Sequence, residues 1–368
     1  MSFGSNWTGQ VCMAGAEWDD GLIIKPYLAF HTDRQLDTGR NPLKGRVLII
    51  DHEARVRRNL TAGLTEEGYF ALACADGISA IHELNQARSM GLHYDYLITG
   101  ILLPDINGLK FLKTIRKMCP ELPALVLSRF GDEDLPESLV SEQNTGYLTS
   151  SFETSDVVQA LSELPSGSTA TCEEMAVSHG GISELSRAFL NIKLTGFEKN
   201  IETFSRLYSM KNSLSCHALR GDVDVLLQIQ AESGDEIESR VQEVRAIEGV
   251  DVLSVATVEK PELDSVVEQF LNTYRKVVTA KERSQKRTDP ASCIFVDIMP
   301  ERIQQIFTTA FFIDQTVQCE VVDKGAGLIC ILADCRSAGR TPEIIEKLSQ
   351  LEGVLRVREA KIISLMNN

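Results

Sequence analysis

The stretch Phe189-Leu190-Asn191-Ile192-Lys193-Leu194 decides the fold of the second half of this chain, because a similar stretch follows 103 residues later, at Ser292-Cys293-Ile294-Phe295-Val296-Asp297. The same offset superposes Phe204 on Phe307 and Cys216 on Cys319. A period of about 100 residues is too long for a solenoid repeat, which has about 20 to 50 residues. The sequence therefore predicts one small domain that occurs twice.

Both copies alternate strand-like and helix-like segments in the same order. An apolar strand precedes a helix, two strands joined by a Gly-containing turn follow, and a second helix and a closing strand complete the copy. We expect the second helices at 235–247 and 341–351, where Thr341-Pro342 suits a helix start because Thr caps and Pro fits the first turn. The order β-α-β-β-α-β is that of a ferredoxin-like, α+β sandwich.

These copies, at 187–258 and 291–368, resemble the effector-binding (RAM) domain of the Lrp/AsnC family. The residues that carry the resemblance are Gly221-Asp222-Val223-Asp224, which match the family's Gly-x-x-Asp hairpin, and the Glu-Gly-Val after the second helix of each copy. In the second copy Lys324 and Gly327 replace the Gly and the Asp.

The resemblance implies a small-molecule effector, such as an amino acid, bound near the first hairpin. By the same resemblance Gly221 and Asp224 are its contacts, and Arg220 and His217 are neighbouring candidates. Gly221 would let the backbone approach a ligand closely. Asp224 has two open roles: it fixes an ammonium group of the ligand, or it is a structural acid of the hairpin.

The segment from 45 to 165 alternates apolar strands with helices, beginning with the strand Arg46-Val47-Leu48-Ile49-Ile50 and including a helix around 133–141. Such alternation predicts an α/β fold with a doubly wound, parallel, five-stranded sheet. Ligands of these sheets bind at the carboxyl ends of the strands. The residues that follow each strand therefore decide the chemistry.

This segment resembles the receiver domain of bacterial response regulators. Leu103-Pro104-Asp105-Ile106-Asn107-Gly108 matches the loop after the third strand, and Asp51 stands in the acidic cluster after the first. The positions that carry the family's chemistry are altered, although one hydroxyl is kept. The phosphoacceptor Asp is replaced by Gly100, the second acid by His52 and the Lys after the fifth strand by Ser150, whereas the hydroxyl at Ser128 is retained.

Aspartyl phosphorylation needs a carboxylate nucleophile, Mg²⁺ held by further carboxylates, and a cation that neutralises the developing charge. The sequence therefore predicts a pseudo-receiver that binds neither phosphate nor metal and acts through protein contacts. His52 is either a polar rim residue, which we favour, or a metal ligand or base. Asp105 is either a turn residue, which we favour, or a substitute phosphoacceptor.

Three connecting segments complete the chain: an arm at 1–44, a linker at 166–186 and a connecting helix at 259–290. The linker is too short for the helix-turn-helix that precedes the effector domain in the Lrp/AsnC family. The connecting helix has an apolar stripe that includes Phe270 and Tyr274, which we expect to pack on the repeats. Its end, Lys281–Arg287, is the most basic run and the local candidate for nucleic-acid binding, although cations also suit any helix C-terminus.

The strands of each repeat are apolar on both sides, as Val225-Leu226-Leu227-Gln228-Ile229 illustrates. An exposed apolar sheet face would be too large for a soluble monomer. We therefore expect the repeats to pair face to face, within one chain or between two chains of a homo-oligomer.

Composition narrows the function further. A net charge of −15 argues against broad binding to a phosphate backbone, and 43% hydrophobic with 24% charged residues is typical of a soluble protein. Nine cysteines without metal-binding spacing predict reduced thiols in the cytoplasm. We expect no membrane span, no cofactor and no enzymatic activity, since catalytic arrangements are missing. The favoured function is signalling, and the alternative is a transcriptional regulator that uses a DNA-binding partner or the local basic run.

Overall fold

The structure, a computed structural model, describes residues 43–128, 144–149, 152–165, 185–195, 200–282, 290–313, 315–333 and 340–363. The expected helix around 133–141 and Ser150 lie outside these residues. So do nearly all of the arm at 1–44, the linker at 166–186 and the basic run at 281–287.

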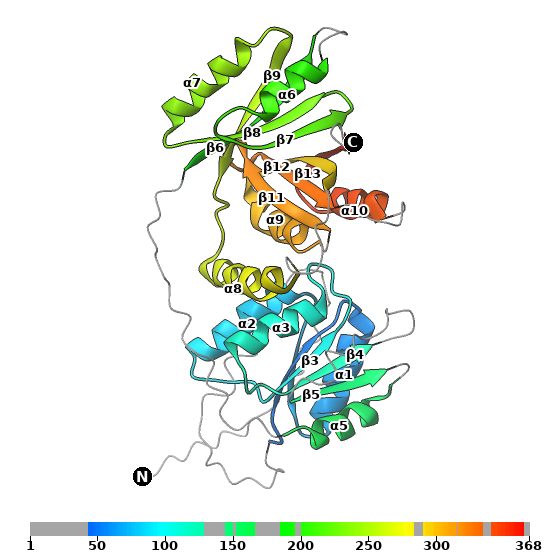
Figure 1. The fold of residues 1–368 in the computed structure, drawn as a ribbon. Coiled ribbons are helices and arrows are strands. Elements are labelled where there is room, and N and C mark those ends of the chain that lie inside the picture. Colours follow the sequence, from blue (N-terminus) through cyan, green and yellow to red (C-terminus); the bar gives the residue numbers. More distant parts are fainter. Residues whose placement is uncertain are drawn as a thin grey trace, which may run out of the picture. The chain divides into compact units, whose positions relative to one another are not determined.

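The first part of the chain forms a parallel sheet of five strands in the order β2-β1-β3-β4-β5 (Figure 1). The strands are β1 (Arg46–Ile50), β2 (Phe70–Cys74), β3 (Tyr96–Gly100), β4 (Ala124–Ser128) and β5 (Thr145–Thr149). Every residue of β3 and β4 is buried, because strands in the middle of such a sheet have helices on both faces. The predicted α/β architecture is confirmed.

Four described helices cover this sheet. Helices α1 (Ala54–Glu66) and α5 (Thr154–Glu163) share a core with Val47 and Ile49. Helices α2 (Gly77–Ser89) and α3 (Gly108–Met118) share a core with Leu48 and Ile50 on the opposite face. Since neighbouring side chains of a strand point to opposite faces, β1 anchors both layers.

The second part contains the two repeats, each with the expected order of elements. The first has β6 (Ser186–Leu194), α6 (Asn200–Tyr208), β7 (Ser213–Arg220), β8 (Val225–Ala231), α7 (Gly234–Arg245) and β9 (Val250–Glu259). The second has β10 (Pro290–Ile298), α9 (Ile303–Phe311), β11 (Thr316–Val322), β12 (Gly327–Ala333), α10 (Arg340–Ser349) and β13 (Val354–Ile363). Helix α10 begins at Arg340, so Thr341 and Pro342 lie in its first turn instead of marking its start.

The eight strands of the repeats form one closed barrel in the order β10-β12-β11-β9-β6-β8-β7-β13. Two pairings join the repeats: β9 pairs with β11, and β13 pairs with β7. The repeats therefore meet within one chain, and their edge strands pair in a way that the sequence patterns did not predict. The barrel interior is packed with buried residues of both repeats: Phe189, Leu219, Leu226, Ala256, Cys293, Phe295, Val322, Ile329 and Ala360.

The barrel corrects the alignment of the repeats by one residue. Phe189 lies opposite Gln228 and Cys293 lies opposite Ile331, so the structural counterpart of Phe189 is Cys293 and not Ser292. Phe189 and Cys293 both lie in the barrel interior. A shift of one residue turns a strand side chain to the other face of its sheet. The constant offset of 103 therefore assigned the side chains of β10 to the wrong faces.

The Glu-Gly-Val of each repeat has a backbone explanation. Gly249 and Gly353 follow the second helices with φ of +83° and +90°, a region that side chains rarely adopt. A Cβ on Gly353 would lie 2.6 Å from Cγ of Arg302, and one on Gly249 would lie 3.2 Å from the carbonyl oxygen of Thr195. These glycines turn the chain from helix into closing strand.

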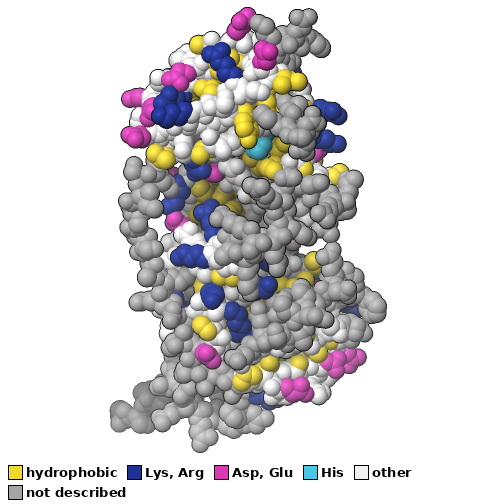
Figure 2. Space-filling view, viewed as in Figure 1, with side chains coloured by type: hydrophobic (Ala, Val, Ile, Leu, Met, Phe, Trp, Pro, Cys, Tyr) yellow, Lys and Arg dark blue, Asp and Glu magenta, His cyan; other side chains and the backbone are white. Residues whose placement is uncertain are grey.

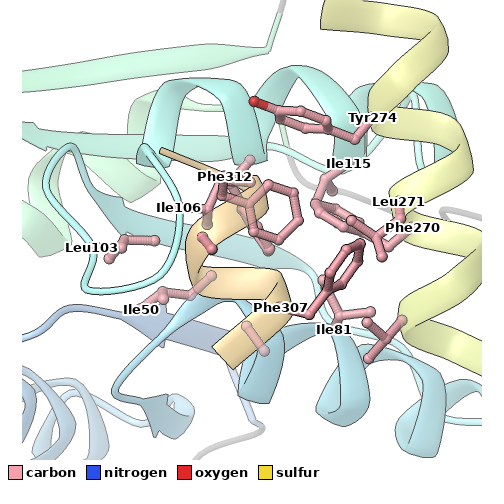
Figure 3. Close-up of a cluster of buried hydrophobic side chains, with 14 of the residues drawn as sticks. Ile50, Ile81, Leu103, Ile106, Ile115, Phe270, Leu271, Tyr274, Phe307 and Phe312 are labelled. Atoms are coloured by element: carbon pink, nitrogen blue, oxygen red, sulfur yellow. The ribbon is translucent and has the colours of Figure 1, made fainter. Parts of the chain in front are cut away.

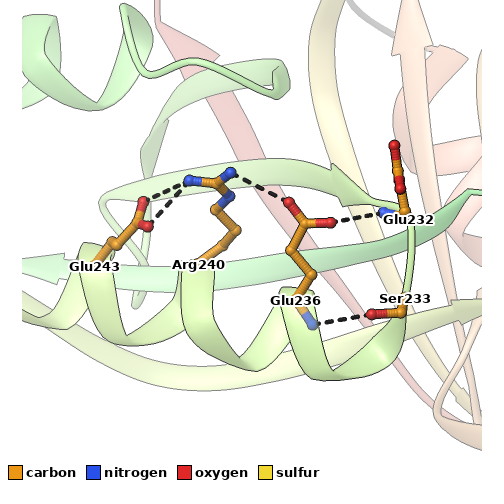
Figure 4. A network of polar contacts seen from close by, with 5 residues as sticks. All are labelled: Glu232, Ser233, Glu236, Arg240 and Glu243. Atoms are coloured by element: carbon orange, nitrogen blue, oxygen red, sulfur yellow. Dashed lines mark hydrogen bonds and ion pairs between the residues drawn. The ribbon is translucent and has the colours of Figure 1, made fainter.

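Helix α7 begins one residue before the expected start because Ser233 caps it. The Ser233 hydroxyl accepts the Glu236 N–H, and the Glu236 carboxylate accepts the N–H of Glu232 (Figure 4). Arg240 joins Glu236 and Glu243 along the exposed side of the helix, at 3.2 and 3.0 Å. Hydrogen bonds to Glu232 and Arg240 lower the pKa of Glu236.

The connecting helix α8 (Ser265–Glu282) corrects another expectation. Its stripe packs on the second repeat, as predicted, but it also packs on α2 and α3 of the first part (Figure 3). The Phe270 ring lies 5.7 Å from that of Phe111 and 6.0 Å from that of Phe312. The apolar stripe of α8 therefore contacts two neighbours, the second repeat on one side and helices α2 and α3 on the other.

Most of the described cysteines are reduced thiols, as expected, and one is not. Cys74, Cys216, Cys293, Cys319 and Cys330 are free and buried, whereas Cys119 is in a disulfide bond. In the described part of the chain, no helix has both the length and the apolar character needed to cross a membrane.

Replacing Gly249 with Ala should lower the free energy of unfolding by about 1–2 kcal/mol, because the left-handed backbone is strained for any side chain. The matched control is Gly234→Ala, which has no atom within 4 Å of the added methyl group. This control should be neutral or stabilising by up to about 1 kcal/mol. Urea unfolding of both variants measures the difference, and equal stabilities would contradict the explanation.

Candidate functional site

The carboxyl ends of β1 and β3 bring Asp51 and Gly100 together, as the receiver resemblance implied. Asp51 is fully buried, and its Oδ1 accepts the N–H of Glu53 at 2.7 Å. A Cβ on Gly100 would lie 3.1 Å from Oδ2 of Asp51. Position 100, which faces the acidic residue that follows β1, therefore has no side chain and no nucleophile.

Basic groups occupy the neighbourhood of Asp51. The His52 imidazole is about half exposed, with Nδ1 3.9 Å from Oδ1 of Asp51. The Arg57 guanidinium donates to the backbone carbonyls of Asp51 and His52, at 2.8 and 2.9 Å. The Glu53 carboxylate also lies 3.9 Å from Nε2 of His52. Two carboxylates beside an imidazole and a guanidinium still do not give Mg²⁺ the several oxygen ligands that it prefers. Within the described residues, no three His, Cys, Asp or Glu side chains are grouped to hold a metal.

Ser128 is buried at the end of β4, where the receiver resemblance placed a hydroxyl. It ends the described segment, so the residues that would continue the site beyond β4 are outside the description.

Asp105 has a structural role in its loop, as the sequence analysis favoured, but its partners in α2 were not predicted. Its buried carboxylate accepts the N–H groups of Gly77, Ile78 and Ile106 at 3.0, 2.8 and 2.9 Å. Burial raises the pKa of Asp105, although these hydrogen bonds act in the opposite direction. The carboxylate ties the loop after β3 to the start of α2. The close approach of the two segments requires the glycine at position 77, because a Cβ there would lie 2.6 Å from Cγ2 of Ile106. This glycine was the sequence feature that could have indicated the contact.

The first hairpin places Asp224 against the end of β6. Its carboxylate accepts the N–H of Leu194 at 2.9 Å and pairs with the Lys193 ammonium at 3.0 Å. Both oxygens are therefore engaged within the repeat, which supports the structural role for Asp224. Gly221 and Arg220 are exposed at the same hairpin, and a Cβ on Gly221 would make only an ordinary contact, 3.7 Å from Ala360.

His217 is half-buried on the side of β7 that is turned toward the barrel interior. Its strand neighbours Cys216 and Ala218 belong to the core beneath the helices, so the alternation of β7 turns His217 to the interior side, as it does Leu219. Burial lowers the pKa of His217.

A chain of polar side chains crosses the same interior. Gln228 accepts from Gln318 at 3.1 Å and from Ser215 at 3.3 Å, and Arg187 pairs with Glu320 at 2.6 Å. These contacts join the two repeats across the barrel.

A hollow of ≈ 420 Å³ lies at the second hairpin, where the sequence analysis least expected a ligand. Its wall contains the turn between β11 and β12, where Asp323, Lys324 and Gly325 have φ of 54°, 56° and 82°. The left-handed backbone is costly at Asp323 and Lys324, though not at the glycine, and such strain concentrates at functional sites. The hollow is lined by Glu259, Lys260, Pro261, Glu262, Pro300, Ile303, Val321, Lys324 and Gly325.

The chain that lines this hollow continues directly into α8. Lys260 pairs with Glu268 of α8 at 2.6 Å, and the N–H of Asp264 donates to Gln304 of α9 at 2.6 Å. Asp264 also caps α8 by accepting the N–H of Val266. The hollow, α8 and the α2–α3 face thus form one connected set of contacts.

Comparison with known proteins identifies the first part of the chain. Residues 47–162 match the model of the response regulator receiver domain, and these residues form such a domain. The DNA-binding transcriptional regulator NtrC of Proteus hauseri is 25% identical over 118 residues, 32% of this chain and 24% of NtrC. The transcriptional regulatory protein CusR of Escherichia coli K12 is 31% identical over 86 residues, 23% of this chain and 36% of CusR. The chain thus spans well under half the length of these relatives.

Among solved structures, the chemotaxis protein CheY4 of Vibrio cholerae is 25% identical. The similarity covers 33% of this chain and 98% of that one, with a TM-score of 0.29.

Acidification should destabilise the protein through His217. Because burial lowers its pKa in the folded state, the unfolded chain takes up the proton first as pH falls below about 6.5. Stability from the neutral imidazole is complete above that pH and is lost as pH falls through the lowered pKa. Denaturant unfolding between pH 7.5 and 5.5 should show a smaller loss for His217→Gln than for the wild type. Parallel pH profiles would contradict this assignment.

Proposed function

We propose that this chain is a non-catalytic regulatory protein that transmits a signal through protein contacts and without phosphoryl transfer. The observation that carries the proposal is Gly100, which faces the buried Asp51 where a receiver domain needs its phosphoacceptor. A second observation supports it: among the described residues, no three His, Cys, Asp or Glu side chains are grouped here to hold the ion that this chemistry needs. The receiver domain is then a pseudo-receiver, and its surface is what remains for signalling.

The repeats supply the input in this proposal. We assign them as ferredoxin-like modules of the Lrp/AsnC type that bind a small effector. The hollow at the second hairpin has the volume of a small-ligand site. Two Lys and two Glu side chains line it together with Pro300, Ile303 and Val321. Balanced charges around an apolar floor suit a zwitterion with a short apolar side chain, which is the chemistry of an amino acid.

Helix α8 is the element that would transmit binding. A ligand in the hollow touches the segment 259–262, and α8 follows it within a few residues. The stripe of α8 is buried against Phe111 on one side and Phe312 on the other. A change in the wall of the hollow therefore acts on the packing of the receiver domain.

The partner in this proposal is a cytoplasmic protein that binds the receiver domain. A second candidate function is transcriptional regulation of the Lrp/AsnC type, exerted through a DNA-binding partner or the basic run at 281–287. It is favoured by the receiver match to NtrC and CusR, whose names describe transcriptional regulators. A mobility shift of DNA by the purified protein alone would favour direct binding, and a shift only with an added partner would favour the indirect route.

Incubation with acetyl phosphate and Mg²⁺ should leave the wild type unphosphorylated, as judged by intact mass and by hydroxylamine-sensitive label. Gly100→Asp should also remain unphosphorylated, because the set of carboxylates that holds Mg²⁺ is still incomplete. This variant should be less stable, since the new carboxylate is placed against buried Asp51. A labile phosphate on the wild type would refute the proposal.

A thermal-shift screen of the full chain against the amino acids should identify one that raises the melting temperature. Lys324→Glu, which reverses a charge on the rim of the hollow, should weaken that ligand roughly tenfold or more. Lys361→Glu is the matched control, because Lys361 is exposed and pairs with Ser292, at the end of β10 away from the hollow.

The variant Asp224→Ala distinguishes a ligand site at the first hairpin from one at the second. It should lower the melting temperature of the free protein, because Leu194 and Lys193 lose their acceptor, but keep the shift caused by the ligand. Loss of binding in Asp224→Ala with normal binding in Lys324→Glu would move the site to the first hairpin.

A further inference from the structure

Two cysteine side chains of the second repeat touch each other in its core. Sγ of Cys319 lies 3.5 Å from Sγ of Cys330, and the two residues are directly opposed on β11 and β12. Opposed residues of antiparallel strands have Cα atoms about 4.5–5.5 Å apart, and disulfide bonds span Cα separations of about 4.4–6.8 Å. Both side chains are free thiols, so the backbone already provides the spacing that a disulfide needs.

The first repeat contains a matched cysteine without such a neighbour. Cys216 of β7 is the counterpart of Cys319 of β11, and each residue is 9% exposed. Cys216 is opposed by Leu227, whereas Cys319 is opposed by a second thiol. At this position the repeats therefore differ by one sulfur at equal burial. Cys216 is an internal control for any reaction that needs two thiols.

The surroundings of the pair determine which oxidant reaches it and which sulfur reacts first. Figure 2 shows hydrophobic and charged side chains on the surface of the first repeat, and the described free cysteines of both repeats are buried beneath the surface. A reagent that reaches them is therefore small and uncharged, as hydrogen peroxide is. Cys319 is 9% exposed and Cys330 is 1% exposed, so Cys319 meets the oxidant first.

The same burial makes the reaction slow. Burial raises the pKa of Cys319, and the nearby Arg275 guanidinium opposes that shift only in part. The thiolate, which is the form that attacks an oxidant, is therefore scarce at neutral pH. The pair is suited to respond to sustained oxidation and not to a brief exposure.

We propose that Cys319 and Cys330 form an oxidation site, at which hydrogen peroxide converts the two thiols into a disulfide that joins β11 to β12. The thiolate of Cys319 attacks one peroxide oxygen, the O–O bond breaks, and the other oxygen leaves as water after taking up a proton. Cys319 is then a sulfenic acid. The sulfur of Cys330 attacks it, the S–S bond forms, and the hydroxyl leaves as water with the proton of Cys330. Two thiols and one peroxide thus give one disulfide and two waters.

Contact between the two sulfur atoms favours the disulfide over further oxidation of Cys319, because the second thiol is already in place when the sulfenic acid forms. The bond shortens the distance between the sulfur atoms from 3.5 Å to about 2.05 Å. The turn of the same hairpin borders the hollow, so the bond also restrains one wall of it. The oxidation itself does not depend on an effector or on the pseudo-receiver.

Peptide mapping of the full chain after exposure to hydrogen peroxide tests the site. Free thiols are alkylated in denaturant without reduction, and trypsin then cuts after Lys324, which separates the two cysteines. The wild type should yield peptide 303–324 joined to peptide 325–336, and a thiol reductant should release both. Peptide 325–336 also contains Cys335, so the experiment is repeated in Cys335→Ser to make the assignment unique. Cys119, which is in a disulfide bond, lies outside both peptides.

Cys216 should be recovered from the same sample as an alkylated thiol. Free thiols at both Cys319 and Cys330 after the exposure would overturn the proposal. So would oxidation of Cys319 to a sulfinic acid without a cross-link to Cys330.

The melting temperature tests whether the bond staples the hairpin. Oxidised wild type should melt at a higher temperature than the reduced protein, because a cross-link restricts the unfolded chain. Cys330→Ala is the matched control, since it cannot form the bond and adds no polar group to the core, and circular dichroism checks that it is folded. Peroxide should not raise its melting temperature. An equal rise in this variant and in the wild type would contradict the assignment of the stabilisation to this disulfide.

Discussion

The pairing of β9 with β11 and of β13 with β7 is the constraint on which the second half of the molecule depends. Each repeat alone has two edge strands, and these junctions pair part of all four, over two residue pairs at one junction and three at the other. Closure also gives the apolar inner faces a common interior, in which Phe189 and Phe295 are buried. The helices are left on the outside, where α9 is available to α8.

The same closure makes two similar repeats unequal. The strand that leaves the first repeat leads into α8, which covers Phe311 and continues toward the receiver domain. Among the described residues, nothing covers helix α6 in this way, and Tyr208 is exposed where Phe311 is packed. The hairpins differ as well: Asp224 is engaged by Lys193, whereas the turn at Lys324 borders a hollow. The two repeats share an order of elements, but because the chain leaves them differently, different parts of their surfaces are covered.

The receiver domain keeps the packing of its fold with Gly100 at the position that the resemblance assigns to the phosphoacceptor. A bound ion and a phosphorylated aspartate would couple β1 and β3 by charge, but here Gly100 and the buried Asp51 carboxylate occupy that place. Other contacts hold the same loop, with Asp105 accepting three N–H groups near the start of α2. The domain thus presents a well-packed α2–α3 surface, and α8 uses it through Phe270 and Phe111.

By itself, the sequence determined the kinds of element and their order, because burial in a parallel sheet and the two periodicities of strand and helix are local properties. It also determined that position 100 has no carboxylate, since a glycine lacks one in any fold. Tertiary structure alone decided the one-residue register of β10, the edge-to-edge closure of the barrel and the two neighbours of Phe270. It also turned the half-buried His217 toward the barrel interior and placed the hollow at Lys324. These features depend on which distant strands and helices meet. An apolar stripe in the sequence predicts that a helix face will be buried, but it does not predict which element will cover that face.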